Sequence, residues 1–347
     1  MTKSLSLTEQ LAKHLMRPVD DATRDRARLH LLDWLGCVAG ARNASIASVF
    51  DKSDKNAASH LAACLGNVLE MDDIHRASIL HPGPVIWGTL VVGHGCTMDE
   101  MLNAAVGGYE AVIAIGSTLD EWHYSHFHNT STAGLFGSAA AVASLYDGSK
   151  AQIVSAMGLA GSVAGGLWQM RNESGDTKQW HIERAMVTGG SAGLYAIDGM
   201  KGPRFILEGP QGLYAATCKT PKPMTFPKPW RIWDVSFKPW GACRHAHPAI
   251  DAALELQELL GNLEGEIVVE TYADAIAFCD NPHPKTPQQA KFSLQHAVAI
   301  VATSGVPTLA DFEPAAIKRL AKTRARVSVR ECKDITARYP QHYGARV

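Results

Sequence analysis

The sequence has 347 residues, of which 46% are hydrophobic, so it is long enough to bury a sizeable core and to form more than one domain. Its 33 lysine and arginine residues are balanced by 34 aspartate and glutamate residues, which argues against nucleic acid or an anionic membrane as a partner. Seven scattered cysteines without a CxxC pair argue against a zinc knuckle and against a disulfide framework.

The N-terminal stretch from Met1 to Arg17 is polar and amphipathic and lacks the apolar core of a signal peptide. No later stretch offers the roughly 18 uninterrupted apolar residues that a membrane-spanning helix requires. The sequence therefore predicts a cytoplasmic protein.

The first helix is marked at both ends. Ser6 followed by Glu9 is typical of a capping box, and Pro18 prevents the helix from continuing. A second helix is expected over Ala22 to Ala39, with its buried side formed by Leu29, Leu32, Leu35 and Cys37. Apolar periodicity predicts further helices over residues 57–69, 98–119, 132–145, 151–170 and 182–200.

Small residues recur along two of these segments, from Gly134 to Ala141 and from Gly158 to Gly166. Because glycine weakens a helix, such positions indicate that helix backbones approach one another closely in the core. A phosphate-binding loop is the alternative for the second segment, but it lacks a preceding strand and a GxGxxG or GKS arrangement.

Four prolines within residues 219–229 indicate a linker, and the pattern changes after it. Strand-like runs at 230–237, 266–272 and 325–329 alternate with helical runs at 246–260 and 287–303. We therefore expect a mainly α fold, with an all-helical domain over residues 1–220 and a smaller α+β, lid-like domain over residues 221–347.

Histidine is the residue that makes the sequence chemically specific. Several of the 15 histidines stand in polar clusters at predicted helix ends, where a side chain can face a cleft. A neutral histidine acting as base, together with lysine or arginine holding carboxylates, suits removal of a proton from a carbon next to a carboxylate. The clusters contain His75 and His81, His126 and His128, Lys178 with His181, and Lys238 through His247.

Two other chemistries compete for the same residues. Asp72, Asp73, His75 and His81, with the histidines at 126 and 128, are ligand types for zinc or a first-row transition metal, although no HExxH motif is present. A Ser-His-Asp hydrolase is disfavoured because no GxSxG elbow occurs.

At these residues the chain resembles the MmgE/PrpD family. The resemblance runs from Leu29-His-Leu-Leu-Asp-Trp-Leu-Gly-Cys to the C-terminus and rests on six landmarks in order. These are Leu69-Glu-Met-Asp-Asp-Ile-His with Ile79-Leu-His-Pro-Gly; His128-Asn-Thr; Thr177-Lys-Gln-Trp-His; Gly202-Pro-Arg-Phe-Ile-Leu-Glu-Gly; Phe237-Lys-Pro-Trp-Gly-Ala-Cys-Arg-His-Ala-His-Pro; and Lys291-Phe-Ser-Leu-Gln-His.

The resemblance implies a helical domain and a smaller α+β domain with the active site in the cleft between them. It also implies homodimerisation through the helical part, a small di- or tricarboxylate as substrate, and no metal or organic cofactor. Members of the family include 2-methylcitrate dehydratase, cis-aconitate decarboxylase and iminodisuccinate epimerase. The expected activity is therefore that of a lyase or isomerase, with a hydro-lyase resembling 2-methylcitrate dehydratase as the first choice.

Site residues carry over by motif position. The implied catalytic residues are His81, His128, Lys178, Glu70 and Asp73, with His128 or His81 as the base and Asp72 beside them. The implied substrate-binding residues are Lys238, Arg244, His247 and His296, with Lys178 also holding a carboxylate. The competing interpretation of the lysines is that they are solvated surface charges. For Asp72 and Asp73, it is that they cap a helix or orient a histidine.

The chain also departs from the family pattern. It is shorter than its relatives between Arg42 and Asn56, and the relatives continue beyond Val347 through a return segment to the helical domain. Many relatives have tyrosine where His296 stands, and the decarboxylase branch has histidine near Cys243, which argues against cis-aconitate decarboxylase itself. Two alternatives therefore stand beside the dehydratase: an iminodisuccinate-type epimerase, and a degenerate member without catalytic activity.

Overall fold

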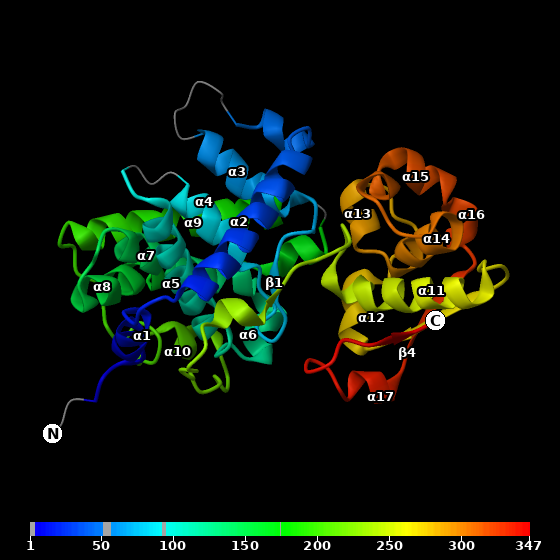
Figure 1. Cartoon of the computed structure of the whole chain (residues 1–347). Coiled ribbons are helices and arrows are strands. Elements are labelled where there is room, and N and C mark those ends of the chain that lie inside the picture. Colours follow the sequence, from blue (N-terminus) through cyan, green and yellow to red (C-terminus); the bar gives the residue numbers. More distant parts are fainter. Residues whose placement is uncertain (1–3, 51–56, 92–94, 174) are drawn as a thin grey trace. The chain divides into compact units, whose positions relative to one another are not determined.

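The computed structural model describes residues 4–50, 57–91, 95–173 and 175–347. The chain forms two compact units (Figure 1). Unit 1 contains residues 1–68 and 72–237, and unit 2 contains residues 69–71 and 238–347. The division at Phe237 and Lys238 falls later in the chain than the predicted linker, and unit 2 also includes the short segment Leu69–Met71.

Unit 1 is a helical bundle. Its helices are α1 (Leu7–Leu15), α2 (Asp21–Gly40), η1 (Ser45–Ser48), α3 (Ala57–Val68), α4 (Pro82–Leu90), α5 (Met98–Gly116), α6 (Glu121–His126), α7 (Asn129–Leu145), α8 (Lys150–Gly161), η2 (Trp168–Arg171), α9 (Thr177–Ile197), α10 (Leu213–Thr217) and η3 (Arg231–Asp234). Its two strands, β1 (Ile74–His75) and β2 (Val235–Ser236), pair antiparallel. Half of the predicted strand over residues 230–237 is thus the 3₁₀ helix Arg231–Asp234, and Val235–Ser236 is a strand.

Unit 2 combines helices with a three-stranded sheet. The sheet has the order β4-β3-β5, in which β3 (Ile267–Thr271) runs parallel to β4 (Val327–Glu331) and antiparallel to β5 (Ala345–Arg346). Its helices are η4 (Arg244–Ala246), α11 (His247–Leu260), α12 (Ala273–Cys279), α13 (Pro287–Lys291), α14 (Leu294–Ser304), η5 (Leu309–Phe312), α15 (Pro314–Arg319), α16 (Ala321–Arg324) and α17 (Lys333–Thr336). The predicted fold class, a mainly helical domain with a smaller α+β domain, is confirmed.

The predicted start of α1 is also confirmed. The Ser6 hydroxyl accepts a hydrogen bond from the backbone N–H of Glu9, while the Glu9 carboxylate accepts one from the backbone N–H of Ser6 at 2.8 Å. The predicted helix over residues 151–170, in contrast, is too long. Helix α8 ends at Gly161, and Gly166 adopts a φ of 106°, which a continuing helix cannot accommodate.

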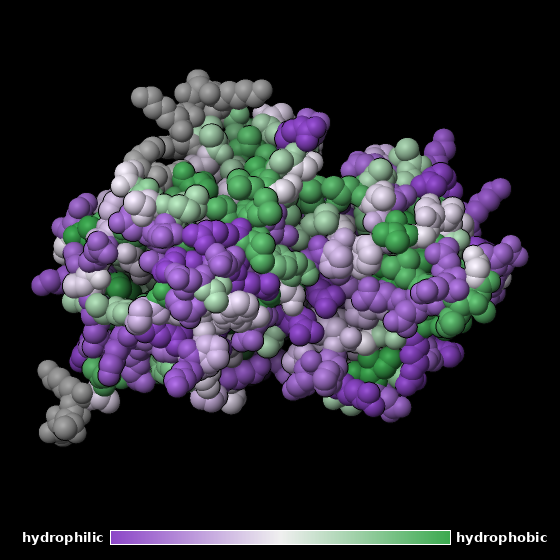
Figure 2. Space-filling model, in the orientation of Figure 1, coloured by the Kyte–Doolittle hydropathy of each residue, from purple (hydrophilic) through white to green (hydrophobic). Residues whose placement is uncertain are grey.

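The predicted buried face of α2 is wrong for its three leucines, although Cys37 is buried as expected. Leu29, Leu32 and Leu35 are 52%, 66% and 46% exposed, whereas Ala27, His30 and Trp34 are buried. Hydrophobicity alone misplaced the face, because a histidine points into the core and leucines point out. Hydrophobic residues gather on the surface of unit 1 over the C-terminal half of α2 (Figure 2).

Helix α7 lies at the centre of unit 1, where it packs against α5 and α9. Small residues make this packing close. A methyl group added at Gly189 of α9 would lie 2.4 Å from the backbone oxygen of Leu135 in α7. One added at Gly137 of α7 would lie 2.9 Å from the backbone oxygen of Gly108 in α5. The expectation that small residues let helix backbones approach is therefore confirmed for the segment from Gly134 to Ala141. In the segment from Gly158 to Gly166, a methyl group added at Gly158 would lie 2.6 Å from the backbone oxygen of Pro203, which lies outside the helices.

Within the described residues, no helix is both long enough and apolar enough to span a bilayer.

Two adjacent glycines of α9 provide a matched test of this packing. We expect Gly189→Ala to lower the free energy of unfolding by about 1–3 kcal/mol, because its methyl group would overlap the backbone of α7. Gly190→Ala should instead raise it by about 0.4–1 kcal/mol, because a methyl group there meets only ordinary contacts, the nearest at 3.6 Å. Urea denaturation measures both, and equal effects of the two substitutions would contradict the close approach of α7 and α9.

Candidate active site

A buried carboxylate fixes the segment that follows α3. Asp73 accepts hydrogen bonds from the backbone N–H of Gly83 at 2.8 Å and from the hydroxyl of Tyr109 at 2.6 Å. The Nδ1 atom of His30 lies 2.7 Å from the same carboxylate, and the indole of Trp87 donates to the Tyr109 hydroxyl. Asp73 therefore ties α2, α4 and α5 to the loop before β1.

The neighbouring carboxylate, Asp72, positions a histidine. Its Oδ2 atom accepts a hydrogen bond from the side-chain amide of Asn67 and lies 2.8 Å from Nδ1 of His81. The backbone N–H of His81 donates to the hydroxyl of Thr130 at 3.0 Å. His81 directly precedes α4, as its N-cap residue. A carboxylate at this distance favours a proton on Nδ1 of His81.

A second histidine, His128, occupies the same position before α7. Its backbone N–H donates to the carbonyl of Gly166, and its ring packs beside Trp168 with the centroids 4.6 Å apart. Its Nδ1 atom lies 3.3 Å from Nδ1 of His181 on α9, and both rings are buried. One turn before His181, the side chain of Lys178 is also buried.

Burial lowers the pKa of His128 well below its usual value, and the neighbouring His181, Lys178 and His81 lower it further. The charge of Asp72 acts in the opposite direction but is the weakest of these influences. Burial likewise lowers the pKa of His181. The histidine pair is thus neutral near pH 7, the state in which an imidazole can accept a proton.

Unit 2 contains its own polar cluster. The Lys238 ammonium lies 3.7 Å from the Glu70 carboxylate, and both side chains are buried. Nearby, Nε2 of His247 donates to the carbonyl of Ala242. Burial, together with the charges of Lys238 and Arg244, lowers the pKa of His247 to about 3.

His296 lies inside the core of unit 2. Its Nε2 atom donates to the carbonyl of Asp311 at 2.8 Å, and its Nδ1 atom accepts from the guanidinium of Arg324 at 3.1 Å. The side chain is fully buried, and its ring packs edge-on against Phe312. With both ring nitrogens bonded to protein groups, His296 has the surroundings of a structural residue.

The structure therefore brings the sequence-predicted residues together in two groups. In unit 1, Asp72, His81, His128 and Lys178 belong to one electrostatic network, and in unit 2 Glu70 and Lys238 pair beside Arg244 and His247. His181 was not among the selected site residues. The signal that could have found it is its spacing of three residues from Lys178, which places both on neighbouring faces of one helix.

The residues in the metal-site alternative are used otherwise. Nδ1 of His75 lies 2.7 Å from the hydroxyl of Ser78, and His126 is exposed beside Trp122. Across the described ranges, no group of three or more histidine, cysteine, aspartate or glutamate side chains is arranged to hold a metal ion. The seven cysteines are free thiols.

Comparison with known proteins decides the family. Residues 6–225 match the family model of the MmgE/PrpD N-terminal domain, and residues 240–347 match that of the MmgE/PrpD C-terminal domain. The chain belongs to the MmgE/PrpD family. A curated relative is cis-aconitate decarboxylase of Homo sapiens, which is 27% identical over 205 residues. That match covers 56% of this MmgE/PrpD chain and 42% of the human protein, so less than half of the relative's length is matched.

Buried neutral histidines make the stability of this family member depend on pH. Burial lowers the pKa of His75 and of His123 to about 4, against about 6.5 in the unfolded chain. Between these values the unfolded state binds more protons. The free energy of unfolding should therefore fall as pH drops from 6.5 to 4, by up to about 1.4 kcal/mol per pH unit for each such histidine.

The variant His123→Gln tests this assignment, because glutamine can retain hydrogen bonds to the hydroxyls of Thr217 and Thr132 that the ring contacts. Urea denaturation at several pH values should show a shallower pH dependence for the variant than for the wild type. If the variant is folded at pH 7 and its free energy of unfolding depends on pH as steeply as that of the wild type, His123 does not contribute to the pH dependence.

Proposed function

We propose that this MmgE/PrpD protein is a lyase or isomerase that removes a proton from a carbon next to a carboxylate of a small di- or tricarboxylate. The dehydration catalysed by 2-methylcitrate dehydratase is the expected type of reaction. The observation that supports this most is the neutral pair of His128 and His181, buried beside the cation of Lys178. A neutral base next to a fixed positive charge suits a reaction in which negative charge develops as a proton leaves.

In the proposed reaction, His128 is the base. If its Nδ1–H donates to Nδ1 of His181, its Nε2 carries the lone pair that accepts the substrate proton. The resulting imidazolium then keeps His181 as its hydrogen-bond partner. Lys178 holds the carboxylate beside the carbon that loses the proton and stabilises the charge that develops there.

His81 is proposed as the acid. For this step His81 carries a proton on each ring nitrogen: the one on Nδ1 faces Asp72, and the one on Nε2 is given to the leaving hydroxyl. A C–H bond and a C–O bond then break, and water departs. Both His81 and His128 directly precede helices, α4 and α7, whose N-termini carry partial positive charge. These helix ends favour a negatively charged substrate.

The remaining candidate residues receive separate roles. We assign Lys238, Arg244 and His247 to carboxylate binding, and Glu70 to keeping the ammonium of Lys238 in place. Asp73 and His296 are assigned to supporting the fold, because the side chain of each is hydrogen-bonded to two protein groups in the interior. No metal or organic cofactor enters this proposal.

The activity test follows deuterium incorporation by NMR, with a panel of di- and tricarboxylates in D₂O and a chelator present. His128→Ala should lower the exchange rate about 10²–10⁴-fold, the usual contribution of a general base. Lys178→Met should lower it by about 10²–10³-fold, whereas Lys178→Arg should retain part of the rate. Because the pKa of His128 is lowered, exchange should persist below pH 6.5.

The control is His126→Ala, since His126 is exposed and makes its contacts within α6. Exchange accompanied by water loss supports the dehydratase, and exchange with inversion but without elimination supports the epimerase. If the folded wild-type protein exchanges no acid in the panel, the proposal is wrong and the chain is a degenerate member of the family.

We also infer that unit 1 forms a homodimer through the exposed face of α2. Leu29, Leu32 and Leu35 continue along this face to the exposed Gly36 and Ala39, a stripe that two copies of a helix can bury against each other. A methyl group at Gly36 would meet nothing within 4 Å, so the helix backbone itself is open to a partner.

Leu32→Asp should convert this dimer to a monomer, because the stripe would then have to bury an unpaired charge. Light scattering after size-exclusion chromatography measures the mass. The matched control is Leu259→Asp on α11, an even more exposed leucine of unit 2, which should leave the mass unchanged. A monomeric wild type, or a dimer that survives Leu32→Asp, would rule out this face.

A further inference from the structure

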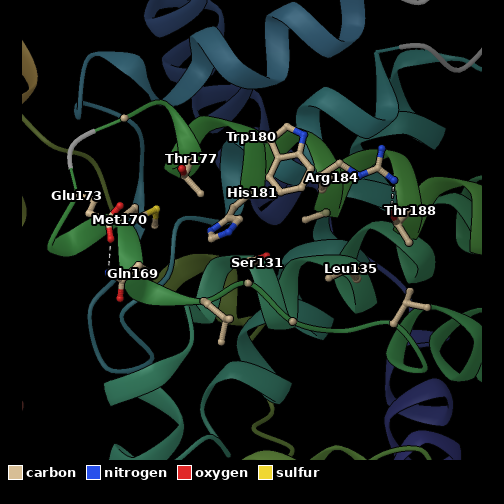
Figure 3. Close-up of a pocket in the computed structure, with 16 residues that line it drawn as sticks. Ser131, Leu135, Gln169, Met170, Glu173, Thr177, Trp180, His181, Arg184 and Thr188 are labelled. Carbon is tan, nitrogen blue, oxygen red and sulfur yellow. Dashed lines mark hydrogen bonds between the residues drawn. The ribbon is translucent and has the colours of Figure 1, made fainter.

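A pocket of about 800 Å³ opens in unit 1 beside the histidine pair. Its walls come from α7, from the segment between α8 and α9, and from α9 itself (Figure 3). Pockets of roughly 300–1,000 Å³ are typical of sites for drug-sized molecules, so this one is well above the needs of a small acid alone.

One face of α9 forms a wall of the pocket. Thr177, the neighbours Trp180 and His181, Arg184 and Thr188 follow one another at intervals of three or four residues, so successive turns present them to the same side. Opposite them, the wall is mainly apolar. Its apolar members include Leu135, Val163, Leu167 and Met170. Trp180, Val163 and Leu167 are each more than half exposed, which leaves their apolar surfaces available to a bound molecule.

His181 connects this pocket to the proposed catalytic residues. It lines the pocket, and its Nδ1 atom lies 3.3 Å from Nδ1 of His128. A molecule whose reacting carbon is at His128 can therefore extend past His181 along α9.

The charged groups lie at opposite ends of the pocket. Figure 3 shows Arg184 and Thr188 at one end, Glu173 with Gln169 and Met170 at the other, and His181 with Trp180 between them. The guanidinium of Arg184 donates to the hydroxyl of Thr188. Among the described residues, no carboxylate lies within 4 Å of it, so its charge can bind an anionic group of a ligand.

We propose that this pocket receives an apolar alkyl or aryl substituent of the substrate, and that Arg184 binds an anionic group carried at the end of that substituent. The proposal rests on the proposed function, since it assigns the reacting end of the molecule to His128 and Lys178. It narrows the substrate class from small acids in general to dicarboxylates with an extended side chain.

The test uses a series of ligands: succinate, methylsuccinate, butylsuccinate, phenylsuccinate and an alkylsuccinate whose chain ends in a carboxylate. Dissociation constants are measured by calorimetry and deuterium exchange by NMR on the same samples. Each buried methylene should tighten binding about fourfold, so butylsuccinate should bind tens of times more tightly than methylsuccinate. Equal affinity across the series would overturn the proposal.

Two variants locate the effect. Val163→Trp, at an exposed position of the pocket wall, should fill part of the space and remove the gain from butyl and phenyl groups while leaving succinate unaffected. Arg184→Gln should weaken only a succinate whose alkyl chain ends in a carboxylate, by about tenfold, the lower range for a charge-assisted hydrogen bond. Arg28→Gln on the surface of α2 is the matched control, with wild-type affinities expected.

Failure of this proposal and failure of the proposed function give different results. Exchange of succinate with no dependence on substituent size retains the function and rejects the pocket. Size-dependent binding that Val163→Trp removes, without any exchange, retains the pocket and rejects the function. A gain that survives Val163→Trp places the substituent elsewhere and rejects the pocket.

Discussion

The buried carboxylate of Asp73 is the constraint on which the geometry of unit 1 depends. Its three partners come from three helices and include a tyrosine hydroxyl and a backbone N–H, so the position of the loop after α3 is tied to all three helices. Asp72 is the adjacent residue, so the position of this loop also determines its contact with His81. A buried charge satisfied in this way is costly to disturb, because any partner that is removed leaves it in a low-dielectric interior.

The helical layer around this anchor explains why the histidines are neutral. Helices α5, α7 and α9 pack closely, and His128 and His181 are buried at the starts of α7 and α9 beside Gly166. The same burial that weakens the charged state of an imidazole also strengthens the field of a nearby ammonium. The small residues of the helices thus contribute to the low-dielectric surroundings of the two histidines.

Much of the fold could be predicted because its signals are local. The capping box of Ser6 and Glu9 is readable from four residues, and small residues in a helical pattern indicate close packing in any fold. The face of α2 could not be predicted, because its histidine is buried to satisfy Asp73, which lies 43 residues away. In the same way, the break between α13 and α14 depends on Ser293, whose hydroxyl caps α14 by accepting from the N–H of His296. In the candidate site, motif position identified His81, His128 and Lys178, whereas the pairing of His128 with His181 depends on a contact across 53 residues.

The three residues Leu69–Met71 have a consequence for how unit 2 can exist. They interrupt unit 1 yet belong to unit 2, and Glu70 in their centre adopts a φ of 55°, a strained backbone state for a residue other than glycine. The counter-charge of the buried Lys238 is thus encoded in the N-terminal part of the sequence. A polypeptide cut at residue 237 would yield a C-terminal piece whose interior ammonium lacks its carboxylate. The two units therefore pack separately, but neither is encoded by one continuous stretch of the sequence. As a result, neither can be exchanged between relatives as a simple N-terminal or C-terminal half.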